Sequence, residues 1–154
     1  MAINRRLEVR KRATRPGGKS TGGLEGCRIL VVEDNDVNQE LMLGILEHAG
    51  LCADVVADGK QALAALERND YEIILMDCQM PVMDGFEATT AIRHRQDHKS
   101  RIPILALTAH AMKGDRERCL AVGMDDYLTK PIERKLLLAK IREWVISGCS
   151  SVSR

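Results

Sequence analysis

The chain has 154 residues, of which 45% are hydrophobic and 29% charged, and its formal net charge is +1. This length predicts one compact domain plus a tail and argues against a multidomain enzyme. No apolar run approaches the roughly 18 residues of a membrane-spanning helix, and no apolar segment follows the N-terminal charges as it does in a secretory signal. We therefore expect a soluble protein of the cytoplasm.

The cysteine and aromatic contents narrow the class further. The five cysteines are far apart, form no C-x-x-C pair and are odd in number, which is typical of free thiols in a reducing compartment. Aromatic residues make up 3% of the chain, too few for the base-stacking surfaces that bind single-stranded nucleic acid.

Charge is distributed unevenly between the first 26 residues and the rest. Residues 1–26 carry seven Lys/Arg against two acidic residues, a net charge of +5, which leaves −4 for the remainder. The acidic body disfavours direct binding to nucleic-acid phosphates. Because residues 16–23 have linker composition, we predict a basic linker or tail over 1–26. Its Gly-Lys-Ser is no phosphate-binding loop, since Ala13 stands where that motif needs glycine.

From residue 27 onward, short apolar runs alternate with segments of helical periodicity. The expected strands cover residues 28–32, 53–56, 73–76, 104–107 and 127–128. The expected helices are one with Leu41, Met42, Ile45 and Ala49 that ends at Gly50, one capped by Asp58, one that opens near Asp84-Gly85, one through Met112, Cys119 and Leu120 to Gly123, and one with Leu137, Ile141, Trp144 and Val145 that ends near residue 147. This alternation predicts an open parallel sheet with helices on both faces.

In such sheets the ligand site lies outside the carboxyl ends of the strands. The residues that follow the predicted strands are three acids, a hydroxyl and an amine, namely Glu33, Asp34, Asp77, Thr108 and Lys130. Any one of them alone is more often a helix cap or a surface charge. Matched groups from four separate strand ends instead predict one site.

Three neighbouring carboxylates need a cation to remain ionised together. Two carboxylates about 4 Å apart repel by roughly 4 kcal/mol at an effective dielectric of 20. Mg²⁺ fits better than Ca²⁺, because Mg²⁺ keeps several waters and takes one or two carboxylates plus phosphate oxygens, whereas Ca²⁺ takes six to eight oxygen ligands. We expect Asp34 and Asp77 to bind it directly and Glu33 to reach it through water. Because the predicted set of side chains contains no Cys or His, zinc is disfavoured.

A metal beside a carboxylate, a hydroxyl and a lysine is suited to phosphoryl transfer. The carboxylate of Asp77 can itself be the nucleophile and form an aspartyl phosphate. Lys130 and Thr108 would then each hold one phosphoryl oxygen.

Four blocks of sequence resemble, in order and spacing, the receiver (response-regulator) domain of two-component signalling. They are Val31 to Asn35, Met76 to Gly85, Leu107 to Ala109 and Tyr127 to Pro131. The resemblance implies an α/β fold with five parallel strands in the flavodoxin-like order 2-1-3-4-5. It would cover residues 27–147, between the tail over 1–26 and a short C-terminal tail over 148–154.

The resemblance also implies roles for residues around the acids. Asp77 matches the phosphoacceptor, Glu33 and Asp34 match the acidic metal-binding pair, and the backbone carbonyl of Gln79 matches a further metal ligand. Gln79 and His110, two positions after Asp77 and Thr108, would flank the attacking water in hydrolysis and set the phosphate lifetime.

The remaining matches concern the conformational switch. Thr108 and Tyr127 match the switch pair, and Lys130 matches the phosphate-binding lysine, with a Lys130-Pro131 bond that is usually cis in the family. An acyl phosphate on Asp77 would draw Thr108 and vacate space that the ring of Tyr127 can fill.

The family implies a partner rather than a small-molecule substrate. The phosphoryl group would come from a phosphohistidine on a histidine kinase or a histidine phosphotransfer domain, and the chain would catalyse only its own phosphorylation and dephosphorylation. The blocks are most similar to receivers of hybrid sensor histidine kinases, in which a phosphorelay passes phosphate onward. A free-standing receiver is the alternative.

Two other classes are less consistent with the sequence. A flavin-binding protein would need a phosphate-binding loop where Glu33 and Asp34 stand. A haloacid-dehalogenase-like phosphatase would have a second acid two residues beyond its nucleophile, where this chain has Gln79. His94 and His98 are four apart, but surface histidines at a helix end explain them better than a metal site does.

Overall fold

The computed structural model describes residues 27–78, 83–109 and 113–153, so the predicted linker over 1–26 lies outside the described residues. Five strands form one sheet, in the order β2-β1-β3-β4-β5, and every neighbouring pair is parallel. The strands are β1 (Arg28–Val32), β2 (Cys52–Val56), β3 (Ile73–Asp77), β4 (Ile104–Thr108) and β5 (Asp126–Thr129). The predicted fold class and strand order are confirmed.

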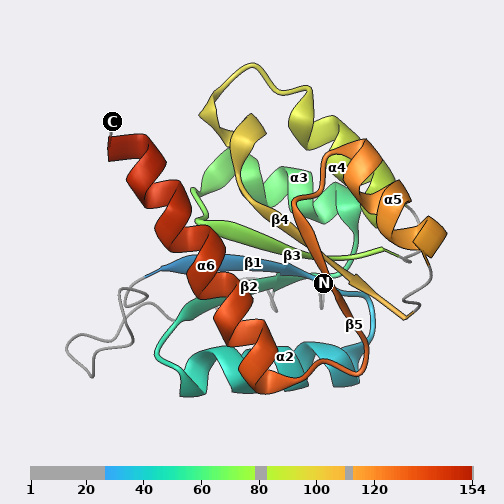
Figure 1. Cartoon of the computed structure of the whole chain (residues 1–154), viewed down its shortest axis with the longest axis vertical. Coiled ribbons are helices and arrows are strands. Elements are labelled where there is room, and N and C mark those ends of the chain that lie inside the picture. The colour runs from blue at the N-terminus through green and yellow to red at the C-terminus, as the bar shows by residue number, and fades with distance from the viewer. Residues whose placement is uncertain (1–26, 79–82, 110–112, 154) are drawn as a thin grey trace.

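The helices form a layer on each face of this sheet. They are α2 (Asp36–His48), α3 (Gly59–Arg68), α4 (Gly85–Arg93), α5 (Lys113–Val122) and α6 (Arg134–Ser153), with a short 3₁₀ helix, η1, at His98–Arg101. Figure 1 shows α2 and α6 on one side of the sheet and α3, α4 and α5 on the other. Helices that connect parallel strands of one sheet in this way are almost always part of right-handed crossovers.

Two apolar clusters fill the space between the sheet and the two helix layers. Successive strand side chains point to opposite faces, so Ile29 and Val31 pack under α2 and α6, whereas Leu30 and Val32 pack under α3, α4 and α5. Strand β3, at the centre, is buried along its whole length. The uninterrupted apolar runs in the sequence therefore reflect burial on both faces.

The helix boundaries follow local chemistry. The carboxylate of Asp58 accepts from the Gln61 amide at the start of α3, and Asp84 and Glu87 form a capping box at the start of α4. Gly50, after α2, has the positive φ of 85° that a side chain would oppose. These boundaries agree with those expected from the sequence.

Three features differ from the expectation. Helix α2 buries Gln39, Met42, Leu43 and Leu46, while Leu41 is 49% exposed. The buried positions recur at helical spacing on the face that packs against the sheet, and residue 41 lies off that face. Helix α6 continues to Ser153 instead of ending near residue 147, since a single glycine disfavours a helix by only about 1 kcal/mol. The 3₁₀ helix η1 was not expected at all.

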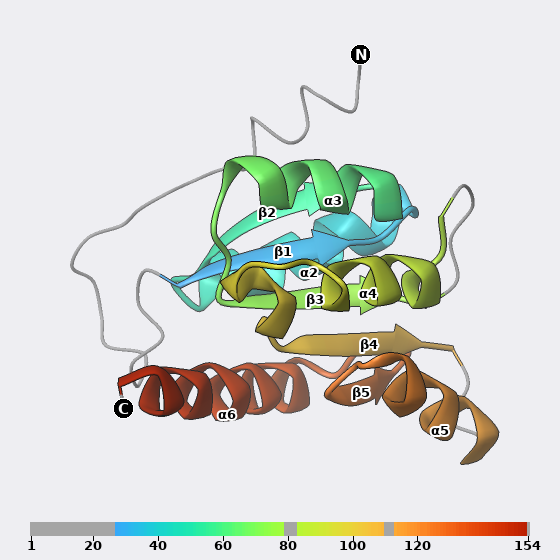
Figure 2. The same ribbon diagram turned by 90° about the horizontal axis from the view of Figure 1, so that it is seen from above.

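All five strands run in the same direction, so their carboxyl ends form one edge of the sheet (Figure 2). Among the described residues, no helix combines the length and the apolarity that a bilayer crossing requires.

Candidate functional site

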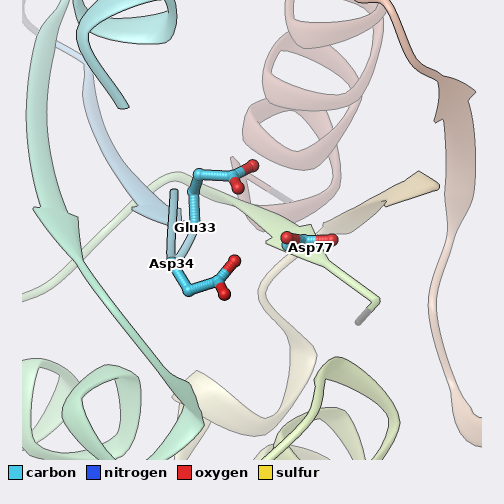
Figure 3. A group of neighbouring side chains, drawn as sticks. All are labelled: Glu33, Asp34 and Asp77. Atoms are coloured by element: carbon cyan, nitrogen blue, oxygen red, sulfur yellow. The ribbon is translucent and has the colours of Figure 1, made fainter. Parts of the chain in front are cut away.

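The three acids predicted from the sequence meet at this edge. Glu33 and Asp34 directly follow β1, and Asp77 is the last residue of β3. One carboxylate oxygen from each lies within 4.8 Å of one from the others, and Figure 3 shows the side chains converging on a common space. Glu33 and Asp77 are only 1% and 3% exposed, whereas Asp34 is exposed to solvent.

Lys130, just after β5, reaches into the acidic cluster. Its Nζ lies 3.3 Å from Glu33 Oε1 and 3.3 Å from Asp77 Oδ2. Burial acts to lower the pKa of Lys130, but the charges of Asp77 and Glu33 and hydrogen bonds to both outweigh it, so the pKa lies above its ordinary value. The amine is therefore a permanent positive charge at neutral pH. The bond between Lys130 and Pro131 is cis, as the resemblance implied.

Hydrogen bonds from the start of α2 hold Glu33 in place. Its second oxygen, Oε2, accepts from the Asn35 amide at 3.2 Å and from Asn38 Nδ2 at 3.3 Å, and its backbone carbonyl accepts from Gln39 Nε2 at 2.6 Å. Both carboxylate oxygens of Glu33 are thus engaged by the protein, whereas Asp34 is exposed to solvent. Sequence reasoning had assigned no structural role to Asn38 and Gln39.

The donor set fits a hard divalent cation. All members of the cluster are carboxylates, the ligand type preferred by Mg²⁺. Lys130 offsets one of the three negative charges, so a divalent ion would neutralise the remainder.

Thr108 and Tyr127 occupy adjacent strands beside the acids. Thr108 ends β4, is 6% exposed and pairs with Thr129, while Tyr127 pairs with Ala106 two residues earlier on β4. Side chains two residues apart share a face of the sheet. Tyr127 is half-buried against the apolar cluster under α3, α4 and α5.

Gly85, at the start of α4, allows close approach to the strand that carries Asp77. A Cβ placed at residue 85 would lie 2.3 Å from the Asp77 carbonyl oxygen. The sequence showed Gly85 as a helix start but gave no sign of this contact, which depends on packing between α4 and β3.

Four further residues were considered in the sequence, namely Gln79, His94, His98 and His110. Gln79 and His110 are outside the described residues. His94 Nδ1 is 2.8 Å from the Thr90 carbonyl at the end of α4, whereas His98 lies on η1, 3.4 Å from Asp70. His94 is the C-cap residue of α4 and His98 belongs to η1, and both are exposed, in keeping with surface roles.

Comparison with known proteins agrees with this geometry. The family model for the response regulator receiver domain matches residues 29–142. The chain belongs to this family. Its fold, with the acids at the carboxyl ends of β1 and β3, is thus the receiver fold of two-component signalling.

The receiver is similar to segments of histidine kinases. It is 43% identical to Histidine kinase 1 of Arabidopsis thaliana over 80% of this chain and 13% of that protein. Identity to the hybrid signal transduction histidine kinase I of Dictyostelium discoideum is 46%, over 78% and 8% of the two chains. The receiver therefore spans only a small part of the curated relatives that it matches.

Solved structures show the same architecture. One is the receiver domain of the sensor histidine kinase PA1611 from Pseudomonas aeruginosa PAO1, which was crystallised with a magnesium ion in its active-site cleft. It is 48% identical to this chain, with a TM-score of 0.72, and the match covers 77% of this chain and 97% of that one. A co-crystal structure from Saccharomyces cerevisiae pairs the receiver domain of Ssk1 with the histidine phosphotransfer protein Ypd1; it is 30% identical, with a TM-score of 0.73 over 79% and 90%.

Proposed function

We propose that this receiver accepts a phosphoryl group on Asp77 from a phosphohistidine of a partner protein. A carboxylate oxygen of Asp77 attacks phosphorus, the new O–P bond forms as the P–N bond breaks, and the electron pair of that bond remains on the departing imidazole nitrogen. The observation that supports this assignment is the convergence of three carboxylates and Lys130 at the carboxyl ends of the strands.

Each neighbouring group has a role in this step. Lys130, 3.3 Å from an Asp77 oxygen, neutralises charge that accumulates on the phosphoryl oxygens. The Thr108 hydroxyl would donate to another phosphoryl oxygen once the group is attached. A Mg²⁺ ion held by Asp34, Asp77 and the Gln79 carbonyl, with Glu33 through water, would supply further charge neutralisation when bound.

The proposed consequence of phosphorylation is a change in conformation. The acyl phosphate adds charge and acceptor oxygens beside Thr108, which would move toward them and leave room for the Tyr127 ring. A partner that contacts only one of the two arrangements then shifts their populations.

The partner and the cellular setting are also part of the proposal. A histidine kinase or a histidine phosphotransfer domain would be the donor, in a phosphorelay of the cytoplasm. Similarity to hybrid kinases supports an origin in such a parent chain. Gln79 and His110 would tune hydrolysis. The alternatives are a free-standing receiver and, more distantly, an aspartyl-phosphate phosphatase.

Phosphorylation with acetyl phosphate and Mg²⁺ tests this function. Intact-mass measurement should show one added phosphoryl group on the wild type and none on Asp77→Asn. Lys130→Ala should lose most of the label, whereas Asp70→Asn, a change at an aspartate whose side chain is 78% exposed, should label normally.

Retained label in Asp77→Asn would disprove the assignment of the acceptor. Rapid repeated turnover of a small phosphate ester by the wild type would favour the phosphatase.

A further inference from the structure

Helix α5 makes two contacts between an arginine and an aromatic ring. The Cζ atom of Arg116 lies 5.9 Å from the centroid of the Tyr127 ring on β5. The Cζ atom of Arg118 lies 4.0 Å from the centroid of the Phe86 ring on α4. A guanidinium within about 6 Å of a ring centroid is attracted to the electron-rich ring face. The two arginines thus connect α5 to two different elements.

Few other side chains fix α5 to the rest of the domain. Among the α5 side chains that the structure describes, only Cys119 is buried and Val122 is half-buried, while Leu120 is 44% exposed. An element with so little buried apolar surface can shift at low cost. The arginine contacts are therefore part of what sets its position, beside the buried Cys119 and the hydrogen bond from Arg93 Nε to the Gly123 carbonyl at the end of the helix.

Tyr127 lies close to Thr108, the residue that phosphorylation of Asp77 is proposed to move. Its pairing with Ala106 puts it two residues from Thr108 along the neighbouring strand, on the face that α5 covers. If the ring changes rotamer when Thr108 moves, the contact with Arg116 changes as well. The contact between Arg118 and Phe86 involves neither Tyr127 nor Thr108.

We infer that Arg116 is a positioning residue for the switch: its guanidinium stabilises the rotamer that Tyr127 adopts in this structure, and so opposes the phosphorylated arrangement. This inference rests on the proposed function of Asp77 and Tyr127. Coupling is reciprocal, so movement of the ring would also release Arg116 and loosen α5. An exposed contact of this kind shifts a two-state population about two- to five-fold.

Three variants separate this role from a general effect of charge on α5. Arg116→Gln removes the cation from Tyr127, Arg116→Lys keeps a cation and should restore part of the effect, and Arg118→Gln makes the same charge change on the same helix without touching Tyr127. Three-bond couplings from Tyr127 Cγ to the backbone nitrogen and carbonyl carbon report its χ1 rotamer. Assignment is simple because the chain has two tyrosines.

We expect Arg116→Gln to raise the population of the second Tyr127 rotamer about two- to five-fold in the unphosphorylated protein, and to raise the rate of phosphorylation by acetyl phosphate by a similar factor. Arg118→Gln should match the wild type in both measurements. Unchanged Tyr127 couplings in Arg116→Gln, or an equal change in Arg118→Gln, would overturn the inference.

The two proposals fail in different ways. A wild type that takes up no phosphoryl group would contradict the function of Asp77, whereas the rotamer measurement needs no phosphorylation and tests Arg116 directly.

Discussion

Lys130 is the residue on which the charge balance of the site depends. It stands between two buried carboxylates, Glu33 and Asp77, at 3.3 Å from each. The acids raise the pKa of Lys130, so its stabilising charge is present at neutral pH and is lost only as the pH rises through that raised value. The third acid, Asp34, has no such compensation in the described ion pairs.

Replacing Asp34 should therefore separate metal binding from stability. In Asp34→Asn we expect higher stability without metal, because repulsion within the cluster is relieved. Mg²⁺ at a hundredfold excess over its Kd should stabilise the wild type by about 2.7 kcal/mol and the variant by much less. Urea unfolding with EDTA and with Mg²⁺ measures both.

Asp36→Asn, two residues along the chain and also exposed, is the control. It should retain the full increment from Mg²⁺. An Asp34→Asn variant with an undiminished increment would show that this carboxylate does not bind the metal.

Two glycines should respond in opposite directions to substitution by alanine. Gly85→Ala would place Cβ 2.3 Å from the Asp77 carbonyl oxygen, and such overpacking costs about 1–3 kcal/mol. At Gly44, within α2, no described atom outside the adjoining backbone of that helix lies within 4 Å of the corresponding position, so Gly44→Ala should stabilise by about 0.5–1 kcal/mol. Urea midpoints test both, and a neutral Gly85→Ala would contradict close packing of α4 on β3.

At the scale of elements, polar side chains fix how β5 and α6 meet. The Asp126 carboxylate accepts from Lys140 Nζ at 2.8 Å and from Trp144 Nε1 at 3.1 Å, both on α6, and from the Tyr127 amide at 2.8 Å. Burial acts to raise the pKa of Asp126, but these hydrogen bonds and the charge of Lys140 outweigh it, so the pKa is lowered. The strand that carries Tyr127 is thereby anchored to α6.

The Asp126 contacts make a pH-dependent contribution to stability. Because the pKa of Asp126 is lower in the folded than in the unfolded protein, its charge stabilises the fold at pH values above the unfolded pKa of about 3.9. This stabilisation is lost as the pH falls through the folded pKa. We expect Asp126→Asn to cost about 1.5–3 kcal/mol at pH 7, with the difference from the wild type shrinking below about pH 4. A difference that stays constant down to pH 3 would show that the carboxylate charge is unimportant.

At the scale of the whole molecule, the two apolar clusters share a single sheet. Trp144 packs against the cluster under α2 and α6, whereas Tyr71 belongs to the cluster on the opposite face. Each strand contributes side chains to both clusters. Neither cluster can therefore unfold while the sheet stays folded.

This architecture predicts cooperative unfolding. Trp144 fluorescence, which reports one face, and far-UV circular dichroism, which reports all elements, should give the same urea midpoint. Leu66→Ala, on the opposite face and fully buried, should lower both midpoints equally, at a cost of about 2–5 kcal/mol. Separate midpoints would show that the two layers unfold independently.

Much of the fold could be predicted from the sequence. The apolar runs that became β1, β3 and β4 are buried on both faces, and local cap chemistry at Asp58 and Asp84 placed helix starts. The sequence-based expectation differed from the structure at the inward face of α2 and at the end of α6, where the spacing of apolar residues and a single glycine do not decide the outcome.

The sequence by itself determined which functional groups the site contains, because the residue after each strand of a parallel sheet lies at the same edge of that sheet. It therefore indicated that Glu33, Asp34, Asp77, Thr108 and Lys130 share one edge. Only the tertiary structure decided how they are held: Asn38 and Gln39 fix Glu33, Gly85 admits α4 against β3, and Arg116 lies over Tyr127. Those contacts join residues on different elements, and their distances depend on how whole elements pack rather than on any local pattern.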